Sequence, residues 1–114
     1  MANYTIDYFE LPSSNGEGSR AFFENAFGWE YLSYGPTYIE IREVGVLGGI
    51  NSDSADRTAY PVIGVRTDDI DAAEQAILAA GGIITRPTYE FPGGKRLHFR
   101  EPGGAELLVY QSTD

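Results

Sequence analysis

The sequence has 114 residues, of which 42% are hydrophobic and 22% are charged, a balance typical of a folded globular domain. Its net charge of −9, from 17 acidic and 8 basic residues, disfavours binding to nucleic acid and to anionic lipid surfaces. The absence of cysteine excludes disulfides, thiolate metal sites and cysteine nucleophiles. No apolar run approaches the roughly 18 residues of a membrane span, and no leader opens the chain, so we expect a cytoplasmic protein.

The first half of the chain predicts a strand, a helix and three further strands. Residues 4–12, YTIDYFELP, alternate as a strand does. Phenylalanines recur at helical spacing in the segment SRAFFENAFG, whose final Gly28 suits a helix end. We expect the core to include Phe9, Phe22, Phe23 and Phe27. Three β-like segments follow at 29–34, 37–43 and 44–50, separated by turn-forming or charged residues.

The second half repeats the same order of elements. A strand at 61–67 precedes a helix that Asp68 or Asp69 caps, and Gly81 with Gly82 ends this helix. The helix presents one apolar face, formed by Ile70, Ala73, Ile77 and Ala80. Strands are predicted at 83–91, 94–101 and 105–111.

Two βαβββ modules therefore emerge, offset by about 53 residues. They span about 4–51 and about 61–111, with a polar linker at about 52–60. Because each half is too small to bury a core by itself, we expect one α+β domain covering residues 1–114.

Alternation sorts the strand residues of the second module into two faces. The face toward the helix is apolar and holds Ile63, Val65, Leu97, Phe99, Leu107 and Val109. The opposite face is mixed and holds Val62, Gly64, Arg66, His98, Arg100, Glu106, Leu108 and Tyr110. We expect this mixed face to line a cup, as apolar and polar groups do in ligand pockets. The alternative is that its polar residues simply face water, which antiparallel sheets permit.

The ordered segments DYFELP, FFENAFGWE, LGGI, VRTDDIDAAEQAILAAGG and HFREPGGAELLVYQ resemble the vicinal oxygen chelate superfamily, the group of glyoxalases, bleomycin-resistance proteins and extradiol dioxygenases. This resemblance covers residues 4 to 111. It implies two βαβββ modules that form a curved, cup-shaped mixed sheet with helices on its outer face, commonly completed in a homodimer.

The resemblance also implies four metal-ligand positions, and these fall on Tyr8, Gly49, Val62 and Leu108. None of these is a usual ligand of a divalent ion. Glu106 lies two residues before the last position, about 7 Å along the strand, and cannot replace it. We therefore expect no metal and no other cofactor. Two alternatives are a ligand role for the lone His98, and a Mg²⁺ or Ca²⁺ site built from Glu10, Glu40 and Glu106.

Without a metal, three classes of function remain open. The first is small-molecule capture of the bleomycin-resistance type, in which aromatic rings and carboxylates hold an aromatic or cationic ligand. Its predicted contacts are Tyr8, Glu10, Tyr38, Val62, Arg66, Arg100, Leu108 and Tyr110. The second is a metal-independent isomerase, lyase or cyclase that uses His98 and Glu106 as acid–base groups, or a glyoxalase-like protein with a non-standard metal site. The third is a non-catalytic interaction module.

Overall fold

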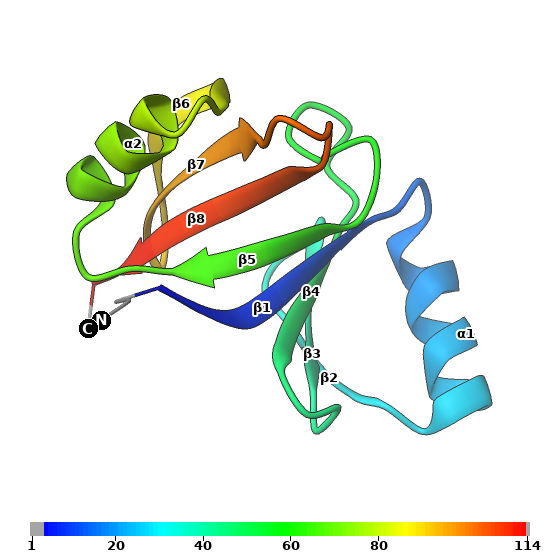
Figure 1. Ribbon diagram of the computed structural model, residues 1–114. Helices are drawn as coiled ribbons and strands as arrows, with labels where there is room; N and C mark the ends of the chain where they lie inside the picture. The colour runs from blue at the N-terminus through cyan, green and yellow to red at the C-terminus, as the bar shows by residue number, and fades with distance from the viewer. Residues whose placement is uncertain (1–3, 114) are drawn as a thin grey trace. The chain divides into compact units, whose positions relative to one another are not determined.

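The computed structural model describes residues 4–113 and contains two successive βαβββ modules (Figure 1). The first consists of β1 (Thr5–Pro12), α1 (Gly16–Phe27), β2 (Glu30–Ser33), β3 (Tyr38–Arg42) and β4 (Leu47–Asn51). The second consists of β5 (Val62–Arg66), α2 (Ile70–Ala79), β6 (Ile83–Phe91), β7 (Gly94–Arg100) and β8 (Glu106–Ser112). The predicted repeat and the predicted α+β class are confirmed.

The chain divides into two compact units, and one of them is Tyr8–Val62. Its strands follow the order β2-β3-β4-β1, in which β1 and β4 are parallel and the other neighbours are antiparallel. Gly49 at the middle of β4 is the register partner of Glu10 on one side and of Glu40 on the other. This pairing places Glu10 and Glu40 on the strands that flank a residue without a side chain.

The other unit comprises the described residues up to Asp7 and those from Ile63 onward. Its strands follow the order β5-β8-β7-β6, with β5 and β8 parallel and the remaining pairs antiparallel. The order of strands thus repeats that of the first module. The pairing of β6 with β7 is irregular, because the register shifts twice between Ile84 and Tyr89.

Both helices begin at a residue whose side chain caps them. Oδ1 of Asn15 accepts the backbone N–H of Gly18 at 3.0 Å, and Oδ1 of Asp69 accepts that of Ala72 at 3.1 Å. Each cap satisfies a backbone donor that has no partner within the helix. Helix α1 ends at Gly28, whose φ of 70° is a left-handed conformation that favours glycine.

Each module has its own apolar cluster between its helix and its sheet. In the first module Ile39, Ile41 and Ile50 are buried, with Phe23 and Trp29 packed against them. In the second module the buried residues are Ile70, Ala73, Leu97 and Val109, with Val65, Ile77, Ile84 and Phe99 packed against them. The side chains that the alternation predicted to face α2 thus include the core of this module.

The expectation that Phe22 and Phe27 belong to the core was wrong. They are 60% and 61% exposed, and α1 has no buried residue. Phe23 alone of the three contacts the sheet cluster, because its neighbour Phe22 points about 100° around the helix from it. Phe27 is the last helical residue and packs against Trp29, with ring centroids 5.4 Å apart, at the end of the cluster.

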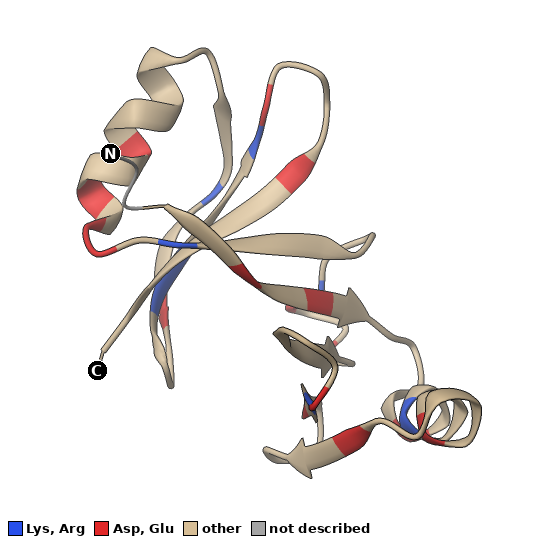
Figure 2. Cartoon of the chain, turned by 60° about the horizontal axis from the view of Figure 1, so that its bottom comes forward, with Lys and Arg blue, Asp and Glu red and all other residues tan. Residues whose placement is uncertain are grey.

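Neither helix of the described chain is long and apolar enough to cross a membrane. Acidic side chains are spread over both modules and mark the beginning of α2 (Figure 2). Each helix carries an acidic side chain in its first turn, Glu17 in α1 and Asp71 in α2. These negative charges lie near the positive end of the helix dipole and stabilise the helix.

Candidate functional site

The second module presents polar side chains on the sheet face opposite α2. Leu97 and Val109 are buried with residues of α2, and successive side chains of a strand point to opposite faces. His98 and Leu108, which are register partners on β7 and β8, therefore point away from the helix.

Tyr89 is the centre of a polar network on this face. Its hydroxyl lies 2.9 Å from Nε2 of His98 and accepts a hydrogen bond from Nε of Arg96. The Arg86 guanidinium lies over the same ring, with Cζ 3.9 Å from the ring centroid. His98 and Arg96 are buried, whereas Tyr89 is only half-buried. The phenol is thus the most accessible group among the three that share these hydrogen bonds.

Glu106 lies beside this network but is held by another group. Its Oε2 is 3.9 Å from Nδ1 of His98, which is beyond hydrogen-bonding distance. The same oxygen accepts a hydrogen bond from Oγ1 of Thr85 at 3.0 Å. The two residues that the sequence predicted as an acid–base pair are therefore neighbours, and the hydroxyl of Tyr89 is the direct partner of the histidine.

A second polar group in the same compact unit joins Asp7, on β1, to Arg66 and Tyr110. The Tyr110 hydroxyl donates to Oδ1 of Asp7 at 2.6 Å, and Nη1 of Arg66 lies 3.8 Å from Oδ2 of Asp7. Burial and this hydrogen bond to Asp7 raise the pKa of Tyr110 from 10.0 to about 12. At neutral pH the phenol is protonated and acts as a hydrogen-bond donor.

The first module carries a separate network on the sheet face opposite α1. Tyr8 and Tyr38 are hydrogen-bonded through their hydroxyl groups, and the Tyr38 hydroxyl also donates to Oε1 of Glu10 at 3.0 Å. Glu10 is 1% exposed. Nδ2 of Asn51 lies 3.5 Å from Oε2 of Glu10 and 2.9 Å from Oδ2 of Asp56. A buried carboxylate is stable only with such partners.

Gly49 allows this network to form. A Cβ atom at residue 49 would overlap the hydroxyl and the ring of Tyr38. The aromatic ring therefore lies across β4 at the point where another residue would project its side chain. This close approach, rather than an unusual backbone angle, requires glycine here.

The structure separates the predicted contact residues into groups. Tyr8, Glu10 and Tyr38 come together in the first module. In the second module Arg66 joins Tyr110, and His98 lies near Glu106.

The remaining predicted contacts differ in accessibility. Val62 and Leu108 are 3% and 1% exposed, so no ligand reaches them in this conformation. Arg100 is exposed and is the register partner of Glu106.

Several polar residues of these networks are absent from the predicted set: Asp7, Asn51, Asp56, Thr85, Arg86 and Arg96. Arg96 was accessible to sequence reasoning, because it lies two residues before His98 on the same strand and so shares its face. Thr85 and Arg86 lie where β6 pairs irregularly, and simple alternation does not place them.

The comparisons with known proteins give the family. The model of the Glyoxalase/Bleomycin resistance protein/Dioxygenase superfamily matches residues 5–109. The chain belongs to this superfamily. The comparison with curated proteins found no match.

Solved structures confirm the superfamily's fold. A Legionella pneumophila structure described as an NAD-dependent benzaldehyde dehydrogenase has a TM-score of 0.77 at 12% identity, covering 94% of this chain and 99% of that chain. A superfamily member from Vibrio splendidus 12B01 gives 0.68 at 16%, covering 95% and 99%. Methylmalonyl-CoA epimerase from Mycobacterium tuberculosis gives 0.69 at 9%, covering 96% and 88%. At these identities the likeness establishes the fold and leaves the chemistry to the residues.

The residues do not fit the metal that many superfamily members use. The four expected ligand positions offer one phenol, at Tyr8, and no nitrogen or carboxylate donor, because the others are Gly49, Val62 and Leu108. Within residues 4–113, no three His, Cys, Asp or Glu side chains gather as a metal-binding group. The three glutamates considered as an alternative site belong to different contacts: Glu10 to Tyr38, Glu40 to Arg42 at 2.5 Å, and Glu106 to Thr85.

Proposed function

We propose that this protein binds a small organic molecule on the sheet face opposite α2, without a metal ion, and captures this molecule rather than converting it. The observation that carries the proposal is the replacement of the superfamily's ligand positions by Tyr8, Gly49, Val62 and Leu108. The filling of the space at Gly49 by the ring of Tyr38 supports it further, because a glutamate ligand has no room there.

The accessible groups of this face define the class of ligand. Glu106, whose side chain is 27% exposed, offers a carboxylate, and Tyr89 offers the part of its ring that the Arg86 guanidinium leaves uncovered. An aromatic ring binds flat molecules and cations, and the net charge of −9 favours the encounter with a cation. We therefore propose an aromatic, positively charged ligand, with Tyr89 and Glu106 as contacts and His98 and Arg96 as residues that position the phenol.

Metal-free bleomycin is the first probe, because it is aromatic and cationic and the superfamily includes proteins of resistance to it. Isothermal titration at neutral pH should give saturable binding, and Glu106→Gln should weaken it about tenfold by removing the opposing charge. Glu90→Gln removes the same charge from an exposed position on β6 and should leave the affinity within twofold. Further aromatic amines extend the screen if bleomycin does not bind.

Elemental analysis tests the metal-free part of the proposal. Protein purified without chelators should contain far less than one equivalent of Mn, Fe, Co, Ni or Zn per chain. Recovery of one equivalent of a transition metal, together with its loss in a Glu106→Gln or His98→Gln variant, would contradict the proposal and favour the non-standard metal site.

A second candidate is a metal-independent enzyme, and the contact of 2.9 Å between Tyr89 Oη and His98 Nε2 favours it. A histidine–phenol pair can transfer a proton to or from a substrate at neutral pH. Substrate candidates are 2-oxoaldehyde with thiol, catechols, fosfomycin and methylmalonyl-CoA, incubated in D2O and followed by NMR. Capture predicts no turnover and no deuterium incorporation. Either one, abolished by Tyr89→Phe, would establish the enzyme instead.

We also propose that the protein forms a homodimer, and the exposed aromatic residues of α1 support this. Phe22 and Phe27 are mostly exposed although their ring centroids are only 6.4 Å apart. Exposed apolar clusters on soluble domains commonly mark interfaces. Light scattering after gel filtration should give twice the mass of one chain, and Phe22→Glu with Phe27→Glu should give a monomer. Tyr60→Glu, at a residue that is 77% exposed, is the control that should stay dimeric.

A further inference from the structure

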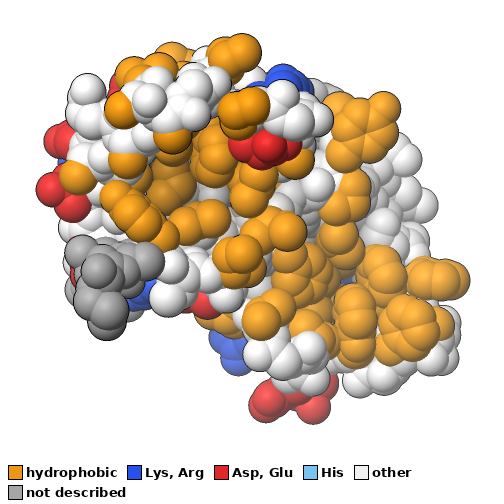
Figure 3. All heavy atoms as spheres, viewed as in Figure 1, with side chains coloured by type: hydrophobic (Ala, Val, Ile, Leu, Met, Phe, Trp, Pro, Cys, Tyr) orange, Lys and Arg blue, Asp and Glu red, His pale blue; other side chains and the backbone are white. Residues whose placement is uncertain are grey.

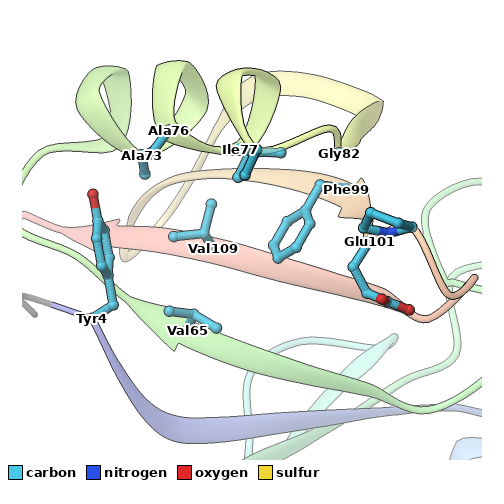
Figure 4. A pocket seen from close by; sticks show the side chains of 11 residues that line it. Tyr4, Val65, Ala73, Ala76, Ile77, Gly82, Phe99, Glu101 and Val109 are labelled. Atoms are coloured by element: carbon cyan, nitrogen blue, oxygen red, sulfur yellow. The ribbon is translucent and has the colours of Figure 1, made fainter.

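An apolar pocket lies beneath α2 (Figure 4). Its volume is about 290 Å³. Val65, Phe99 and Val109 of the sheet form one wall, and the residues of α2 form the other. Tyr4 lies at one end, and Glu101 lies at the other. The whole pocket belongs to the compact unit that comprises the described residues up to Asp7 and those from Ile63 onward.

Short side chains on α2 leave this space open. Ala73, Ala76 and Ala80 line the pocket with Ile77, where longer residues would reach the strands. Leu97 and Val109 are buried, with 0% and 2% of their surface exposed, whereas Val65 and Phe99 on the same face are only half-buried. Figure 3 shows hydrophobic side chains gathered under this helix and over β5 and β8. The packing between helix and sheet is thus incomplete on the side of β5.

The charges around the pocket exclude an anionic occupant. Among residues 4–113, no cationic side chain lines it, and the one carboxylate in its lining is that of Glu101. Backbone N–H groups of Gly103 and Ala105 donate to Glu101 at 2.8 and 2.7 Å, and they lower the pKa of this carboxyl. The carboxylate is therefore ionised, fixed in its turn and already bound to donors. A fatty acid or another organic anion would meet this negative charge, and a cation would find no second carboxylate among the described lining residues.

We propose that this pocket binds an uncharged apolar small molecule, of the size of one aromatic ring or a short alkyl chain. A hydrocarbon-lined cavity offers no partners for ordered water, and engineered cavities of about 150 Å³ accept benzene. The space beneath α2 is larger than that and has the same kind of lining, and it is partly open to solvent. Binding would complete the burial of Val65 and Phe99, which supplies the driving force.

This pocket is distinct from the face proposed to capture an aromatic cation. The pocket-lining residues Val65, Phe99 and Val109 alternate along their strands with residues of the other face, such as His98 and Leu108. The proposal of a binding site beneath α2 therefore does not depend on the proposal of ligand capture on the opposite face.

Toluene is the probe for the experiment, with the full chain in solution. Titration followed by ¹H–¹⁵N and methyl NMR should give saturable shifts at Val65, Ile77 and Val109, and nuclear Overhauser contacts between these methyl groups and the toluene ring. Ala76→Leu should weaken binding at least tenfold by filling the pocket. Leucine is a strong helix former, so α2 should persist in the circular dichroism spectrum.

Ala79→Leu is the matched control, because Ala79 lies on α2 outside the pocket and is exposed. It should leave the affinity for toluene within twofold, and so should Glu106→Gln on the opposite face. Absence of saturable shifts, or equal binding by Ala76→Leu, would overturn the proposal. Dissociation of an oligomer by toluene in sedimentation experiments, with Ala76→Leu monomeric, would also overturn it, since a second copy would then cover the pocket.

Discussion

The aromatic ring of Tyr38 fills the space that a side chain at residue 49 would occupy, so that glycine at 49 and tyrosine at 38 depend on each other. In relatives that use a metal, the family resemblance puts a glutamate ligand near position 49. Here the Tyr38 hydroxyl donates instead to Glu10 and bonds to Tyr8. A buried polar network therefore stands at the position where the resemblance implies a metal ligand.

Gly49→Ala should lower the free energy of unfolding by about 1–3 kcal/mol, because the added methyl group overlaps the Tyr38 ring in a buried strand. Urea denaturation followed by circular dichroism measures the change. In a Tyr38→Ala background the ring is gone, and the same substitution should cost much less. An equal cost in both backgrounds would show that Tyr38 does not create the requirement for glycine.

Tyr89→Phe should destabilise the second module by about 1–3 kcal/mol, because it removes the acceptor of buried Arg96 and the partner of buried His98. The aromatic ring and its stacking with Arg86 remain, so the loss reports the hydroxyl. Tyr60→Phe, at an exposed residue, should change the unfolding free energy by less than about 0.5 kcal/mol. Comparable values for the two variants would mean that water replaces the Tyr89 hydroxyl without penalty.

Asp69→Ala should cost about 1 kcal/mol, since it removes the side chain that caps the first turn of α2 at Ala72. Asp68→Ala is the matched control: it removes the same charge one residue earlier, outside the cap position. Urea titration of both variants under identical conditions separates the cap from the charge. If the two lose equal stability, the effect is electrostatic and the capping hydrogen bond contributes nothing measurable.

Periodicity was sufficient to predict the elements and the facing of regular strands. Alternation placed Leu97 and Val109 toward the helix and His98 and Leu108 away from it, and the structure agrees. Strand alternation did not predict the contacts of β6, because the pairing of this strand is irregular. On β6 the register shifts twice between Ile84 and Tyr89, so a simple count of faces does not place Tyr89, and its contact with His98 was not predicted.

Helical spacing likewise predicted that α1 forms, but it did not predict which of its side chains are exposed. Phe22, Phe23 and Phe27 are equally apolar in sequence, and only the position of the sheet decides which of them is covered. The Tyr38 network depended on a close approach across β4, which is a tertiary contact that no local pattern encodes. The capping residue of α2 could be predicted from the sequence, because Asp69 bonds to a backbone group within one turn of its own helix.

The ionisation of Tyr110 gives a direct test of its contact with Asp7. Its pKa is raised from 10.0 to about 12, first by burial and then by the hydrogen bond to Asp7. The folded state therefore keeps a proton that the unfolded state loses. The stabilisation is fully present below pH 10 and is lost as the pH rises toward about 12.

NMR titration of the tyrosine ¹³Cζ signals should show that Tyr110 is among the last of the eight tyrosines to ionise. The Tyr110 signal is assigned as the one that disappears in Tyr110→Phe. Asp7→Asn removes the charged acceptor and should lower the pKa of Tyr110, whereas Asp71→Asn on α2 should leave it unchanged. An unshifted titration in Asp7→Asn would assign the whole effect to burial.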